Sequence, residues 1–177
     1  NTQAATDHDV KINVTDSIGA MAWQNFTISV QNANDAPVLE IPAVIPDATE
    51  DVFYQLDINA SDEDQLNLAG DTLTYSLSGA PEGMTINETG MINWTPENAN
   101  ADRNWSITVT VFDTRGGTDS ETFTLWVVNV NTGPNITTEL ETIVYSDEDE
   151  VYNQLFEAED NDTIHGDQLT WTLASNG

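Results

Sequence analysis

The 177-residue chain carries 31 acidic side chains against three basic ones, which gives a formal net charge of −28. This charge excludes nucleic acid as a partner, because the phosphates would be repelled. The absence of cysteine excludes a disulfide framework. No apolar run is long enough to span a bilayer.

The first predicted element is a β-hairpin. Apolar residues alternate with polar ones from 10 to 14 and again from 26 to 30, as they do in strands with one buried face. The turn between them is at 16–19. A hinge follows at 31–37, where Pro37 lacks an N–H group and ends one sheet before the next begins.

The next ninety residues consist of short apolar segments separated by turns. Extended segments are predicted at 38–44, 52–58, 73–77, 84–86, 90–94, 105–111 and 123–127. No segment has a helical period of any length. Seven strands at this spacing indicate an all-β fold, a β-sandwich of the immunoglobulin-like kind.

The sequence repeats itself with a period of about 97 residues. Val14-Thr-Asp16 matches Val111-Phe-Asp113, and the strand Leu73–Leu77 returns as Leu169–Leu173. The hinge also recurs, at 128–134. The predicted domains are the C-terminal part of one repeat (1–33), a complete repeat (34–130) and the N-terminal part of another (131–177). Because both ends lie inside a repeat, we expect the chain to be a slice of a longer protein.

Five motifs together resemble the bacterial and archaeal cadherin-like repeat. They are the hinge Asn32-Ala-Asn-Asp-Ala-Pro37, Ala60-Ser-Asp-Glu-Asp64, Leu73–Leu77, Thr89–Pro96 and Val111–Gly117. Repeats of this type occur in tandem in large surface adhesins and are related to dystroglycan-type cadherin-like modules. The resemblance implies calcium between successive domains. The acidic charge and the Asn-X-Ser/Thr motifs favour an extracellular or cell-surface location.

The resemblance also implies which residues bind the calcium. Ca²⁺ takes six to eight oxygen ligands, and carboxylates and carbonyls from several loops suit it. The implied ligands at the first junction are Asn34, Asp35, Asp62, Asp64 and Asp113. At the second junction they are Asn129, Asn131, Asp160 and Asp162, with Glu50 or Asp51 from the far end of the complete repeat. Thr132 stands where the first hinge has Asp35, so the second site should be weaker or differently built.

A simpler explanation of these acids stays open. Asp and Asn are abundant in β-turns because their side chains hydrogen-bond the local backbone. The sequence offers little for catalysis, since His8 and His165 have no partner at triad or metal-ligand spacing. The predicted function is therefore non-enzymatic: a calcium-stiffened stalk or filament segment of a cell-surface adhesin, with neighbouring repeats as its partners.

Two alternative functions remain. Trp23 and Trp126 alternate out of step with the apolar residues of their strands, so both rings could stack on surface glycans in a carbohydrate-binding module. In addition, the two partial repeats together nearly make a whole one. Like chains could then assemble head to tail in an extracellular filament or surface layer.

Glycosylation is a further expectation. The motif Asn-X-Ser/Thr occurs more often than this composition predicts by chance. The candidate sites are Asn13, Asn25, Asn59, Asn87, Asn93, Asn104, Asn135 and Asn161.

Overall fold

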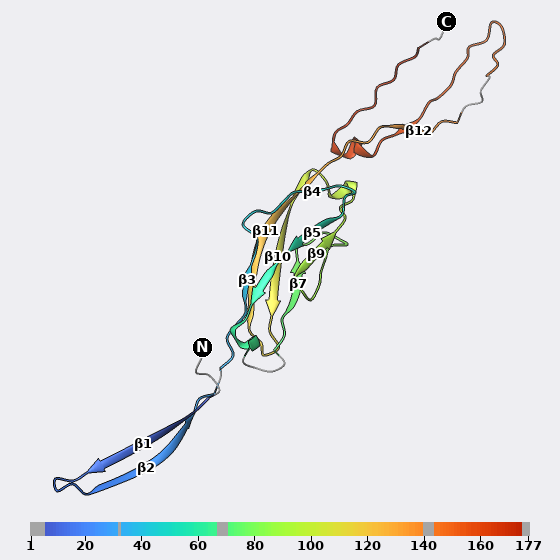
Figure 1. The fold of residues 1–177 in the computed structure, drawn as a ribbon. Helices are drawn as coiled ribbons and strands as arrows, with labels where there is room; N and C mark the ends of the chain where they lie inside the picture. The colour runs from blue at the N-terminus through green and yellow to red at the C-terminus, as the bar shows by residue number, and fades with distance from the viewer. Residues whose placement is uncertain (1–5, 32, 67–70, 140–143, 175–177) are drawn as a thin grey trace.

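The computed structural model describes residues 6–31, 33–66, 71–139 and 144–174. The chain is elongated, with a hairpin at the N-terminal end, a sandwich in the middle and an extended C-terminal segment beyond it (Figure 1). The helical segments of the described residues are short 3-10 turns, η1 (Glu63–Leu66), η2 (Asn98–Asn100) and η3 (Asn161–His165). Among those residues, no helix is long and apolar enough to cross a membrane.

The N-terminal hairpin pairs β1 (Asp7–Thr15) with β2 (Met21–Ser29) in antiparallel register. Its turn is held by Asp16, whose Oδ1 accepts the backbone amides of Ile18 at 3.0 Å and Ala20 at 2.8 Å. Both predicted strands are confirmed. β1 extends beyond the alternating residues at both ends, whereas β2 begins earlier than predicted, at Met21, and ends at Ser29.

The central sandwich has two layers. One sheet has the spatial order β4 (Ala48–Thr49), β11 (Thr118–Val128), β10 (Arg103–Phe112) and β7 (Thr74–Ser78). The other layer contains β3 (Val38–Glu40) paired with β6 (Asn59–Ser61), and β5 (Tyr54–Asp57), β9 (Met91–Trp94) and β8 (Thr85–Ile86) in that order. Only Ile58 separates β5 from β6. With β3/β4 and β5/β6 each taken as one interrupted strand, the sandwich has the seven strands that the sequence predicts.

The first strand of the sandwich differs from its prediction. Of the expected segment 38–44, only 38–40 form a strand, β3, which is antiparallel to β6; β4, at 48–49, lies beyond that segment and is parallel to β11. Pro42 and Pro46 lie between the two pieces, and neither can donate to a ladder. The chain therefore leaves one sheet there and joins the other.

The core lies between the layers and follows the alternation in the sequence. Ile107, Val109 and Val111 on β10 are fully buried, as is Ile92 on β9. Fully burying one such side chain is worth about 1.5–3 kcal/mol. Trp94 is also buried, and its Nε1 donates to the carbonyl of Glu82 at 3.2 Å.

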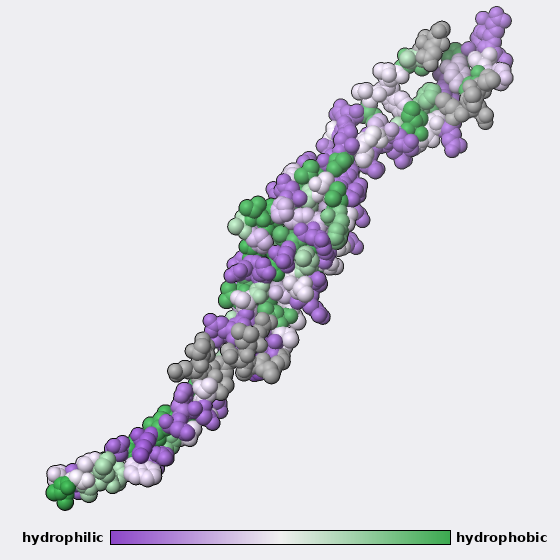
Figure 2. Space-filling model, in the orientation of Figure 1, coloured by the Kyte–Doolittle hydropathy of each residue, from purple (hydrophilic) through white to green (hydrophobic). Residues whose placement is uncertain are grey.

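The two end segments expose apolar side chains that the sandwich buries (Figure 2). Ile12 on β1 is 58% exposed, whereas Val109, its counterpart one repeat later, is fully buried. In the C-terminal segment, only β12 (Asn135–Ile136) and β13 (Ala158–Glu159) are strands among the described residues. Ile136 on β12 is 62% exposed, and its counterpart Leu39 is buried. Each end therefore carries core-type side chains without the layer that covers them in the central sandwich.

Candidate metal centre and domain junctions

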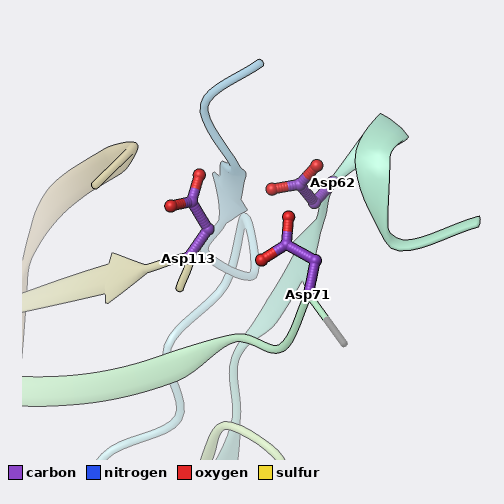
Figure 3. Close-up of side chains that lie close together, drawn as sticks. All are labelled: Asp62, Asp71 and Asp113. Carbon is purple, nitrogen blue, oxygen red and sulfur yellow. The ribbon is translucent and has the colours of Figure 1, made fainter. Parts of the chain in front are cut away.

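Three aspartates converge where the first hinge enters the sandwich. Asp62 follows β6, Asp71 precedes β7 and Asp113 follows β10, so three loops at one end of the sandwich supply them. A carboxylate oxygen from each lies within 4.8 Å of the others. The side chains face a common space (Figure 3), and each is only 7–8% exposed.

Two of these carboxylates are only half satisfied. Asp62 Oδ1 accepts the amide of Asp64 at 2.7 Å, and Asp71 Oδ1 accepts the amide and hydroxyl of Thr114 at 3.2 and 2.6 Å. The Oδ2 atoms of Asp62 and Asp71 are buried and have no hydrogen-bond partner. Buried polar atoms are nearly always paired, so two neighbouring exceptions make this cluster the candidate metal centre of the described residues.

Asp113 is the best-anchored member of the cluster. Its Oδ2 accepts Asn34 Nδ2 at 2.8 Å, and its Oδ1 accepts the amides of Arg115 at 2.7 Å and Gly117 at 2.8 Å. The bond from Asn34, opposed by burial and aided by the backbone amides, lowers the pKa of Asp113 below its ordinary value. The cluster therefore keeps a carboxylate at neutral pH.

The hinge is tied to this cluster through its backbone and side chains. The amide of Asp35 donates to Asp64 Oδ2 at 2.6 Å, while Asn34 reaches Asp113. The structure thus places the five residues predicted for the first junction at one end of the sandwich. Asp71 is an additional member that the sequence reasoning missed. Its signal was the recurrence of Gly70-Asp71 as Gly166-Asp167 after a loop of different length.

The second junction is organised around Glu50 and Asp162, which are 2% and 1% exposed. Asn98 lies between them, with its Nδ2 at 3.3 Å from Glu50 Oε1 and 3.1 Å from Asp162 Oδ1. Thr132 donates both its amide, at 2.6 Å, and its hydroxyl, at 2.8 Å, to Asp162 Oδ2. These two bonds lower the pKa of Asp162, and hydrogen bonds from Asn129 and Asn98 lower it further by smaller amounts.

The other predicted residues of the second junction have different roles. Asp160 caps η3, since its Oδ1 accepts the amide of Asp162 at 2.8 Å. Asn129 has a buried Oδ1 without a hydrogen-bond partner. Asn131 Nδ2 makes a local bond to the carbonyl of Thr132 at 3.4 Å. Asp51 is exposed, and its backbone amide donates to the carbonyl of Pro96 at 2.9 Å.

Sequence reasoning missed Asn98 and His165 at this junction. Nε2 of His165 lies 3.0 Å from the backbone carbonyl of Asn98, so this histidine contacts the neighbouring unit. No motif marks either residue. Both are recognisable only once η2 and η3 are known to meet.

The tryptophans predicted to contact glycans are not brought together. Trp126 on β11 is half-buried, and Trp23 on the hairpin is 64% exposed with Lys11 Nζ 4.7 Å from the centre of its ring. Of the predicted glycosylation sites, Asn93 is half-buried, and its side chain bonds Gln55 and the carbonyl of Met91. The exposed ones are Asn13, Asn25, Asn59, Asn87, Asn104, Asn135 and Asn161.

Comparison with solved structures supports the fold. The chain is similar to cadherin domains 3–6 of protocadherin gamma B2, with a TM-score of 0.51 and 12% identity over 78% of this chain and 35% of that one. For protocadherin gammaB7 EC3-6 the TM-score is 0.47 and the identity 17%, over 88% of this chain and 40% of that one. For Drosophila N-cadherin EC1-4 the TM-score is 0.47 and the identity 18%, over 77% of this chain and 36% of that one. The chain thus spans well under half the length of each. No curated protein matches.

The sequence of residues 36–128 matches the He_PIG family, described as "Putative Ig domain". This match covers more than half of the chain and coincides with the central sandwich. The similarity to the protocadherin gamma B2 domains, with a TM-score of 0.51, is a likeness of fold. The chain belongs to the He_PIG family of immunoglobulin-like domains, with an all-β, cadherin-like fold.

Proposed function

We propose that this chain is a non-enzymatic segment of a tandem-repeat stalk, stiffened at its first junction by a bound calcium ion. The observation that carries the proposal is the pair of buried Oδ2 atoms of Asp62 and Asp71, which lack hydrogen-bond partners and face Asp113. Two unit charges 4 Å apart near a protein surface repel by about 4 kcal/mol. A divalent cation would turn this repulsion into attraction.

The chemistry of the cluster fits calcium. All the available donors are oxygens, and no histidine or cysteine is in the cluster, so it does not resemble a zinc site. Asp62, Asp71 and Asp113 would supply carboxylate oxygens, with Asp35, Asp64 and the Asn34 carbonyl group as further candidates from the hinge and its loop. Calcium accepts such irregular sets of six to eight oxygens more readily than Mg²⁺.

The position of the cluster links binding to stiffness. Asn34 and Asp35 belong to the hinge, whereas Asp62, Asp71 and Asp113 belong to loops of the sandwich. An ion held by both groups would fix the hinge to the sandwich. Without it, repulsion between the carboxylates would oppose close approach and the junction would flex.

The end segments support a tandem array. The hairpin β1–β2 corresponds in sequence to β10–β11, so we infer that residues 1–33 close a preceding repeat and that 131–177 begin a following one. The exposed apolar faces of both ends are those that a complete repeat buries. We infer an extracellular or cell-surface location, with neighbouring repeats as partners. The sequence also predicts calcium binding at the second junction by Glu50, Asn129, Asn131, Asp160 and Asp162; that prediction is untested and is not part of this proposal.

Thermal unfolding with calcium and with chelator tests the proposal. At a free calcium concentration 100-fold above Kd, binding adds about 2.7 kcal/mol to the free energy of unfolding. For a domain of this size, that raises the unfolding midpoint by roughly 10 °C or more. Equal midpoints in calcium and chelator would remove the basis of the proposal.

The variant Asp71→Asn sharpens this test. Its side-chain oxygen can still accept the bonds from Thr114, while an amide replaces the unpartnered Oδ2. Because repulsion is relieved, the midpoint in chelator should stay the same or rise. The shift caused by calcium should shrink. Asp57→Asn, at an exposed position on β5, is the matched control and should keep the full calcium shift.

A further inference from the structure

The second junction is held together by a continuous hydrogen-bond network between two repeats. Asn98, on the turn η2 of the sandwich, reaches both Glu50 of the same unit and Asp162 of the next one. The carbonyl of Asn98 also bonds His165 Nε2 at 3.0 Å. Turn η2 of the sandwich therefore lies directly against η3 of the C-terminal segment.

The hinge between these units is bound into the same network. The amide of Val130 donates to Glu50 Oε2 at 3.2 Å, and the amide of Glu50 donates to the carbonyl of Val128 at 3.1 Å. Further along the hinge, Thr132 donates its amide and hydroxyl to Asp162 Oδ2. Val128, Val130 and Thr132 of the hinge are thus hydrogen-bonded to Glu50 on one side or to Asp162 on the other.

The two junctions differ in how their buried carboxylates are satisfied. At the first junction, the Oδ2 atoms of Asp62 and Asp71 have no donor. At the second, both oxygens of Glu50 and both oxygens of Asp162 accept hydrogen bonds. Those donors are neutral side chains and backbone amides, so both buried carboxylates of the second junction are satisfied by hydrogen bonds. Among the described residues, the buried oxygen without a partner there is the uncharged Oδ1 of Asn129.

Asn98 occupies the bridging position. A carboxamide has two donor hydrogens and no charge, so its NH₂ group can satisfy one carboxylate oxygen on each side. Hydrogen bonds to charged groups contribute more to stability than those between neutral groups. Both hinges donate a backbone amide at the equivalent position, and the hydroxyl of Thr132 adds a donor where the first hinge has the carboxylate of Asp35.

We propose that the second junction is a direct docking interface that needs no metal, bridged by Asn98 and clamped by Thr132. The first junction depends on a divalent cation, so the rod combines a cation-sensitive joint with a constitutive one. This inference rests on the proposed function for its contrast between the joints, but the interface itself stands on the hydrogen bonds of the second junction.

Distance measurements across each junction separate the two ideas. The chain has no cysteine, so cysteines introduced in pairs are the only sites for spin labels. Exposed Glu121 on β11 serves as the common position. Pairing Glu121→Cys with Ile164→Cys spans the second junction, and pairing it with Asn25→Cys spans the first. The distance distributions are then recorded for the 177-residue chain in calcium and in EGTA.

The expected result is one narrow distribution across the second junction that is the same in calcium and EGTA. Across the first junction, the distribution should broaden in EGTA. Broadening across the second junction in EGTA would overturn the direct interface while leaving the calcium joint intact. A first junction that ignores calcium, next to an unchanged second one, would contradict the proposed function and not this interface.

Two variants of Asn98 test the bridge itself. Asn98→Ala removes the donors and should broaden the second-junction distribution in both conditions. Asn98→Asp places a third carboxylate beside Glu50 and Asp162, so the distribution should broaden in EGTA and narrow again in calcium. Asn104→Ala, at an exposed position on β10, is the control and should behave like the parent chain. A second junction that stays narrow in EGTA with Asn98→Asp would refute the bridging role.

Discussion

Asp35 donates its backbone amide to Oδ2 of Asp64 across 2.6 Å. Thr132, one repeat later, makes the same bond to Oδ2 of Asp162, also at 2.6 Å. The hinge therefore meets the loop of the following unit in one geometry at both junctions. What differs is the side chain at this hinge position, a carboxylate in one case and a hydroxyl donor in the other.

Gly117 controls the shape of the first junction. A Cβ added at Gly117 would overlap Asp113 Oδ2 and lie 2.9 Å from the Cα of Ala36 in the hinge. We expect Gly117→Ala to displace the Asp113 carboxylate and to lower calcium affinity roughly tenfold or more, a change of about 1.4 kcal/mol or above. Isothermal titration calorimetry with calcium measures this directly.

Gly116 provides the control for that variant. Its φ of 99° is unfavourable for other residues, but no atom lies within 4 Å of a Cβ added there. Gly116→Ala should therefore lower the free energy of unfolding by about 1 kcal/mol and leave calcium affinity close to that of the parent. Equal losses of affinity in the two variants would show that overlap with Asp113 is not the cause.

Asp35→Thr tests the difference between the hinges. The substitution gives the first hinge the side chain of the second, where the hydroxyl of Thr132 donates to Asp162. The threonine should add a donor to Asp64 and remove one charge from the cation site. We expect the unfolding midpoint in EGTA to rise and the calcium-induced shift to fall by at least half. An unchanged calcium shift would exclude the Asp35 side chain from cation binding.

Tyr54 should limit stability at high pH. Burial raises the Tyr54 pKa to about 12, and the negative charge of the exposed Asp47 adds to this effect. The unfolded chain loses the phenolic proton near pH 10, so stability is fully present below pH 10 and falls as the pH rises towards 12. Denaturant unfolding between pH 9 and 12 should show this loss. Tyr54→Phe, which also loses the bond to the carbonyl of Pro46, should lack this part of the pH dependence.

Core positions in the sandwich and in the hairpin should respond differently. Ile107 is fully buried, so Ile107→Ala should lower the free energy of unfolding of the sandwich by about 2–5 kcal/mol. Ile12 is 58% exposed, so Ile12→Ala should change the free energy of unfolding by less than about 0.5 kcal/mol. Chemical denaturation monitored by tryptophan fluorescence provides both values. A large loss from Ile12→Ala would mean that the hairpin is covered by another part of the protein or by a second copy.

Much of the fold could be predicted from the sequence because it depends on local patterns. The alternation at 105–111 and 123–127 predicted β10 and β11, and the prolines at 42 and 46 marked the break in the first strand. The transfer of the second piece, β4, to the other sheet was not predictable. It depends on parallel pairing with β11, nearly eighty residues away in sequence.

The candidate site was predictable only where its residues repeat in register. Asp62, Asp64 and Asp113 belong to recurring motifs, so the sequence identified them as candidates. Asp71 follows a loop whose length differs between the repeats, so the sequence did not group Asp71 with the other three aspartates. Asn98 carries no acidic signal, and its role depends on contacts with residues 48 and 64 positions away.

Small-angle scattering of the intact chain in calcium and in EGTA tests the central claim most directly. If a cation holds the first junction, calcium should give a longer, narrower particle with a sharper pair-distance distribution than EGTA gives. Superimposable profiles in the two conditions, at calcium concentrations that saturate every binding site found by calorimetry, would contradict the account.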